Sequence, residues 1–108
     1  MVRGIYYVEI PYSDFSKLKG RPVLVFHQLQ NDFLFLPLTS NLTRDGVRLN
    51  NSDLESGFLK KESVVVVPKI SAIDCKIIKT AKLLATIDTI KFKEILSYAC
   101  NSLQCYKI

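Results

Sequence analysis

Residues 19–26 (KGRPVLVF) and residues 33–40 (FLFLPLTS) are the two stretches that decide the fold of this chain. Each combines an apolar, strand-like run with a polar group at one end: Arg21 begins the first strand, and Thr39 and Ser40 end the second. The short polar turn between them predicts an antiparallel hairpin. In that hairpin Arg21 and Thr39 meet at one edge of a sheet, where a cation beside a hydroxyl group favours binding of a phosphate.

The rest of the chain predicts a small, mainly β domain. Residues 5–10 are rich in β-branched and aromatic side chains, and residues 22–29 are almost continuously apolar, which predicts a strand buried on both faces. Further strands are expected at residues 33–38, 47–49, 63–67 and 83–87. A helix start is expected at residues 52–55 with Gly57 as its stop, and Asp74 is expected to cap a single helical turn.

The last segment, from Asp88 onward, has a helical pattern. Its apolar side chains recur at three- and four-residue spacing and form one stripe, made of Phe92, Ile95, Leu96, Ala99 and Leu103. Several short strands followed by one long helix predict a strongly curved β-barrel that the helix closes on one side.

Length and charge limit the class of protein. At 108 residues the chain is the size of one domain, spanning 1–108, and its 48% hydrophobic content indicates a globular fold. The formal net charge of +5 points to an acidic partner such as nucleic acid, anionic lipid or an acidic protein, although a merely basic protein has the same charge. The longest apolar run, at residues 64–68, is too short to span a membrane, so no membrane association is expected.

The cysteines indicate a reducing compartment. Cys75, Cys100 and Cys105 form no C-x-x-C pair and lie far in sequence from His27, the single histidine. This spacing argues against a metal site and favours thiols in the cytoplasm. The N-terminal residues lead directly into a strand pattern, without the features of a secretory signal.

Four stretches, in this order, resemble the MazF/PemK family of endoribonuclease toxins from bacterial toxin–antitoxin modules. They are residues 3–4 (RG), 11–22 (PYSDFSKLKGRP), 37–40 (PLTS) and 53–74, which include GFLKKESV and KISAID. The resemblance covers nearly the whole chain. It implies an SH3-like barrel of five to seven strands with a C-terminal helix, and it implies a homodimer.

The resemblance also implies a function: sequence-specific cleavage of single-stranded RNA, including mRNA, without a metal or other cofactor. The family's catalytic arginine and threonine correspond to Arg21 and Thr39. RNA carries its own nucleophile, the 2′-OH, so the enzyme needs to hold an in-line geometry and stabilise charge on the phosphoryl oxygens. The expected products are a 2′,3′-cyclic phosphate and a 5′-OH. Because an arginine stays protonated, it is a poor base, and the group that removes the 2′-OH proton is left unassigned.

Several polar residues near this edge are candidates for RNA binding. Lys17, Lys19 and Arg44 lie in the two polar loops that flank the Arg21–Thr39 edge, and they are expected to contact the RNA backbone. Ser40 follows the catalytic threonine as in many family members, and Asn41 is a candidate for reading a base edge. The alternative for each residue is ordinary solvated loop polarity.

The resemblance leaves three functions open. Some family members carry an arginine and an aspartate at the positions of Val66 and Pro68, and neither residue here can do acid–base chemistry. This departure supports the alternative of a non-catalytic, RNA-binding member. A third possibility is a toxin on the same barrel that poisons DNA gyrase through its terminal helix. A toxin of any of these kinds implies a cognate antitoxin, whose acidic disordered tail is expected to lie in the basic groove.

Overall fold

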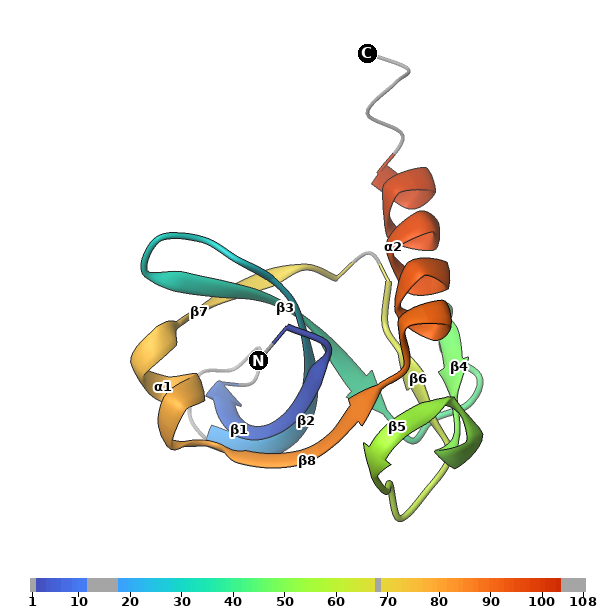
Figure 1. Cartoon of the computed structure of the whole chain (residues 1–108), viewed down its shortest axis with the longest axis horizontal. Helices are drawn as coiled ribbons and strands as arrows, with labels where there is room; N and C mark the ends of the chain where they lie inside the picture. Colours follow the sequence, from blue (N-terminus) through green and yellow to red (C-terminus); the bar gives the residue numbers. More distant parts are fainter. Residues whose placement is uncertain (1, 12–17, 68, 104–108) are drawn as a thin grey trace.

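The computed structural model describes residues 2–11, 18–67 and 69–103. The described residues form eight strands, two α-helices and one 3₁₀ helix (Figure 1). The strands are β1 (Gly4–Pro11), β2 (Leu18–Gln28), β3 (Asp32–Thr39), β4 (Val47–Leu49), β5 (Leu54–Gly57), β6 (Ser63–Val65), β7 (Ser71–Asp74) and β8 (Lys82–Ile87). The helices are the 3₁₀ helix η1 (Asn51–Asp53), α1 (Cys75–Thr80) and α2 (Thr89–Leu103).

All strands belong to one antiparallel sheet that curls into a half-barrel. The strand order is β4-β6-β3-β2-β1-β8-β5, and β7 pairs separately with β3. Figure 1 shows β1, β2 and β8 curving together, with α2 at one end of the curl beside β4 and β6. The prediction of a mainly β barrel-like fold with a C-terminal helix is therefore confirmed.

The strand count exceeds the predicted five to seven because β5 and β7 carry little strand signal of their own. A helix start was predicted at residues 52–55, but the Asn50 and Asp53 capping box closes only the single turn of η1. The chain then turns into β5, which pairs with β8 and ends at Gly57, where φ is +76°. The predicted cap at Asp74 is confirmed, since its carboxylate accepts a 2.7 Å hydrogen bond from the Lys76 N–H at the start of α1.

Both faces of the central hairpin are buried, as the apolar run in β2 predicts. Val23 and Val25 belong to one apolar cluster, with Phe33 and Phe35 of β3, whereas Leu24 belongs to another on the opposite face. All three β2 side chains are fully buried. The β2–β3 ladder is thus the wall between the two halves of the core.

Helix α2 completes the second of these clusters. Asp88 caps its first turn, because the Asp88 carboxylate accepts a 2.7 Å hydrogen bond from the Lys91 N–H. Ile95 and Ala99 are buried with Leu49 of β4 and Ile87 of β8. The apolar stripe extends beyond this contact, and Leu103 is half-exposed near the end of the helix. Neither helix in the described part of the chain is long and apolar enough to cross a membrane.

Two isoleucines of α2 allow the docking of this helix to be tested. Ile95 is fully buried and Ile90 is 81% exposed. We expect Ile95→Ala to lower the free energy of unfolding by about 2–5 kcal/mol, because it opens a cavity between helix and sheet. The matched change Ile90→Ala should alter it by less than about 0.5 kcal/mol. Urea unfolding measures both, and equal effects of the two changes would contradict the observed packing.

Candidate nucleic-acid interface

A cleft of about 990 Å³ lies where the ends of several strands come together, and we call it the basic cleft. Its lining comes from β1, β2, the end of β3, the segment between β5 and β6, the start of β6 and the start of β8. The residues that line it are Tyr7, Arg21, Pro22, Leu38, Thr39, Ser40, Phe58, Leu59, Lys60, Lys61, Ser63, Lys82, Leu83 and Leu84.

The register of the β2–β3 hairpin brings Arg21 and Thr39 to this cleft. The ladder runs antiparallel and pairs Val23 with Pro37. Two residues further along both strands, Arg21 and Thr39 occupy corresponding positions, because successive positions in an antiparallel ladder keep the same offset. Both residues are half-buried and both line the basic cleft. The structure therefore brings together the two side chains that the motifs singled out.

The turn after β3 orients the Thr39 hydroxyl group. Its oxygen accepts a 3.2 Å hydrogen bond from the Asn41 N–H. Because the oxygen is the acceptor here, the hydroxyl hydrogen can be donated to another group, such as a phosphoryl oxygen. The Asn41 side chain turns into its own loop, where it accepts hydrogen bonds from the Thr43 N–H at 3.1 Å and from the Thr43 hydroxyl at 2.6 Å.

A clamp on Leu59 holds the segment that supplies two of the cations. The Asn51 amide accepts a 2.7 Å hydrogen bond from the Leu59 N–H and donates a 3.1 Å bond to the Leu59 carbonyl. Leu59 itself is buried. Its neighbours Phe58 and Lys60 are exposed and line the cleft. One asparagine on η1 thus fixes the backbone from which the 58–61 segment presents its side chains.

Among the described residues that line the basic cleft, all the charged side chains are positive. Four of the described residues that line it are cations, namely Arg21, Lys60, Lys61 and Lys82, and none of them is an aspartate, glutamate or histidine. Within the described residues no three Asp, Glu, His or Cys side chains gather into a possible metal site. A set of cations lining one cleft attracts anions, and a polyanion can engage several of them together.

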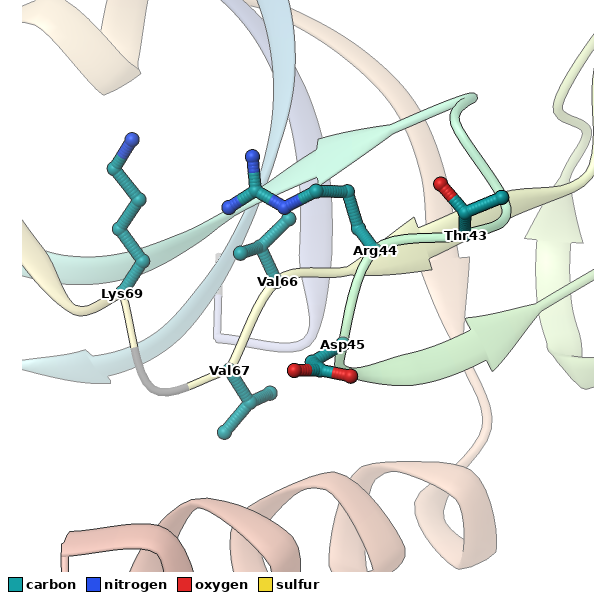
Figure 2. Close-up of a pocket in the computed structure, with 6 residues that line it drawn as sticks. All are labelled: Thr43, Arg44, Asp45, Val66, Val67 and Lys69. Atoms are coloured by element: carbon teal, nitrogen blue, oxygen red, sulfur yellow. The ribbon is translucent and has the colours of Figure 1, made fainter.

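A second cleft, of about 450 Å³, contains Arg44 (Figure 2). Figure 2 shows the Arg44 and Lys69 side chains extending to one side of the chain with Val66 between them, while Asp45 extends to the other. Arg44 thus lines a different cleft from Arg21 and Thr39. Val66, at one of the two positions that depart from the family pattern, is buried, and its N–H donates a 2.8 Å bond to the Pro37 carbonyl.

The other sequence candidates are placed only in part. Ser40 is exposed and lines the basic cleft. Lys19 pairs with Ile10 in the β1–β2 ladder, but its side chain, like the whole of Lys17, lies outside the described residues. Pro68 lies outside them as well.

Sequence reasoning missed several residues of the cleft. Lys60 and Lys61 were noted only as part of a family motif, and Tyr7 and Lys82 were not singled out. Tyr7 pairs with Lys82 across the β1–β8 ladder, which joins positions 75 residues apart. The available signal was local: Tyr7 lies between Tyr6 and Val8, and this alternation predicts that its ring faces away from them. Burial raises the pKa of Tyr6 in the core, whereas Tyr7 is half-exposed in the cleft.

Removal of the Asn51 clamp should cause a measurable loss of order in the backbone at Leu59. We expect Asn51→Ala to lower the free energy of unfolding by about 1–3 kcal/mol, because two hydrogen bonds to Leu59 are lost. Amide hydrogen exchange at Leu59 should become faster than in the unaltered protein. The control is Asn101→Ala on the exposed face of α2. If Leu59 keeps its protection after Asn51→Ala, the clamp does not hold this segment.

The chain matches none of the protein-family models and none of the curated proteins with which it was compared. The resemblance to the MazF/PemK family therefore rests on the motifs quoted above. A function has to be argued from the residues of the basic cleft.

Proposed function

We propose that this protein is a metal-independent endoribonuclease of the MazF/PemK type that cleaves single-stranded RNA in the basic cleft. The observation that carries the proposal is the shared position of Arg21 and Thr39. A guanidinium group and a hydroxyl donor line one cleft with three lysines, and no described residue of its lining is acidic. Such a cleft suits a reaction in which negative charge develops on a phosphate.

The chemistry uses the nucleophile that the substrate supplies. The ribose 2′-oxygen attacks the adjacent phosphorus, an O2′–P bond forms and the P–O5′ bond breaks. The products are a 2′,3′-cyclic phosphate and a 5′-OH, and the proton lost from the 2′-OH is balanced by one gained by the 5′-oxygen. Arg21 binds two phosphoryl oxygens with its planar fork. Thr39 donates its hydroxyl hydrogen to a non-bridging oxygen, so both groups stabilise charge that grows in the transition state.

The lysines have a different role in this proposal. Lys60, Lys61 and Lys82 come from the 58–61 segment and from β8, on other elements than the Arg21–Thr39 hairpin. They contact phosphates on either side of the scissile bond and hold the strand in register, without reading its sequence. Binding should therefore weaken steeply as the salt concentration rises.

The proposal includes a protein partner. A polyanionic, disordered tail of a cognate antitoxin would compete with RNA for the same cations, because both present closely spaced negative charges. The partner would thus neutralise the toxin by occupying the basic cleft.

A non-catalytic, RNA-binding protein is the second candidate, and one observation favours it. None of the described residues that line the basic cleft is a histidine or a carboxylate, and Val66 is buried at a position where some family members carry a charged residue. In that case RNA binds in the cleft and remains intact. The experiment below separates the two functions.

Cleavage should depend on Arg21 and on the Thr39 hydroxyl group. With long single-stranded RNA and a chelator present, we expect Arg21→Ala and Thr39→Val each to lower the cleavage rate by about 100-fold or more, since each removes one donor to the transition state. Electrophoresis and analysis of the fragment ends measure rate and products. Arg48→Ala and Thr80→Val are the matched controls, because both residues lie outside the lining of the basic cleft. If the unaltered protein produces no fragments, the nuclease proposal is wrong and the non-catalytic, RNA-binding function remains.

The dependence of the cleavage rate on pH tests whether a protein side chain acts as the general base. None of the described residues that line the basic cleft is a histidine or a carboxylate, so in this proposal removal of the 2′-OH proton depends on hydroxide. We expect the cleavage rate under substrate-saturating conditions to rise about tenfold per pH unit between pH 6 and 8. A plateau within this range would instead show that a protein side chain titrates as the base.

A further inference from the structure

Three large apolar side chains are exposed inside the basic cleft. Tyr7 is 49%, Phe58 66% and Leu83 51% exposed, and all three line the cleft that contains the four cations. They come from β1, the 58–61 segment and β8, so the strand pairing and the Asn51 clamp bring them together. An exposed group of apolar side chains bordered by cations is typical of a surface that binds a ligand.

The strand register fixes the surroundings of Tyr7. Tyr7 pairs with Pro22 of β2 on one side and with Lys82 of β8 on the other. Directly opposed residues project to the same face of an antiparallel sheet, so Pro22, Tyr7 and Lys82 form a row across three strands. All three line the basic cleft. An aromatic ring in this row has a cation as its immediate neighbour.

Gly20 fixes where the Tyr7 ring lies. A Cβ atom added to Gly20 would overlap the hydroxyl oxygen and Cζ of Tyr7, so the ring would have to move. The outer part of the ring therefore rests against the Gly20 backbone. This diagonal contact between neighbouring strands restricts the ring, since a residue with a side chain at position 20 would displace it.

We propose that Tyr7 and Phe58 form a stacking platform for unpaired bases of single-stranded nucleic acid, with Gly20 as the positioning residue for the Tyr7 ring. The inference rests on the proposed function, because it describes how the same cleft holds its substrate. Basic grooves that carry exposed aromatic rings bind single strands by pairing phosphates with cations and bases with rings. Every base has a π-face, so this contact accepts different sequences and excludes bases that are already stacked in a duplex.

Binding is measured separately from cleavage with a 2′-O-methyl RNA oligonucleotide, which lacks the nucleophile. We expect the unaltered protein to bind the single strand at least tenfold more tightly than the corresponding duplex. Tyr7→Leu should weaken single-strand binding by about tenfold, whereas Tyr7→Phe should retain it, because only the ring is needed. Phe58→Leu should also weaken it. Tyr98→Leu, at a half-exposed tyrosine on α2 outside the cleft, is the matched control.

An abasic oligomer of the same length separates stacking from charge. It keeps the phosphates but has no bases to stack. We therefore expect the abasic oligomer to bind more weakly than the base-containing strand, and its binding to be unaffected by Tyr7→Leu. An acidic peptide should behave in the same way. If the abasic oligomer binds as tightly as the base-containing strand, or if Tyr7→Leu weakens the binding of all three ligands equally, the platform is refuted.

The role of Gly20 is tested by a double-mutant cycle. Gly20→Ala should weaken single-strand binding about as much as Tyr7→Leu, because the new methyl group displaces the ring. In the Tyr7→Leu background, Gly20→Ala should cause no further loss. Additive losses would refute the positioning role. Urea unfolding of each variant shows that the protein remains folded at the assay temperature.

The outcomes distinguish this inference from the proposed function. If the protein cleaves RNA but its binding does not depend on Tyr7, the stacking platform is wrong and the proposed nuclease function stands. Tyr7-dependent binding without any cleavage would support the platform and overturn the nuclease.

Discussion

The central constraint of this structure is the burial of the β2–β3 hairpin on both faces. Val23 and Val25 pack on one side and Leu24 on the other, and all three are fully buried. A slip of one residue in the ladder would exchange the two sets of side chains, so the apolar core fixes the register strongly. Arg21 and Thr39 lie just beyond the paired residues of this ladder. The core therefore determines where the two polar side chains stand, although neither belongs to it.

The same constraint explains why a cluster of cations is tolerated. Arg21, Lys60, Lys61 and Lys82 line one cleft, and their mutual repulsion lowers the stability of the free protein. The repulsion is limited by solvent, because the three lysines are exposed. The structural elements that present them are held by apolar packing and by the Asn51 clamp. The fold thus holds several cations together at one surface, where they attract anions.

Features of the structure that depend on local sequence patterns could be predicted, whereas features that depend on pairing between distant strands could not. The apolar run of β2, the stripe of α2 and the Asp74 cap are each visible in a short window, and each is found in the structure. Strand β5 was missed because residues 52–55 have the pattern of a helix start, and only pairing with β8 makes residues 54–57 a strand. Tyr7 and Lys82 were missed for the same reason: the ladder that joins them has no local signal.

The composition of the cleft bears on how it could distinguish RNA from DNA. The proposed stacking platform and the cluster of cations would accept either backbone, because bases and phosphates are common to both. Among the described lining residues there is no histidine or carboxylate that could activate an external nucleophile such as water. In the proposed reaction the substrate carries its own nucleophile, and only RNA has a 2′-OH beside each phosphate. In this proposal the choice of RNA is therefore made at the chemical step, whereas binding selects for an unpaired strand.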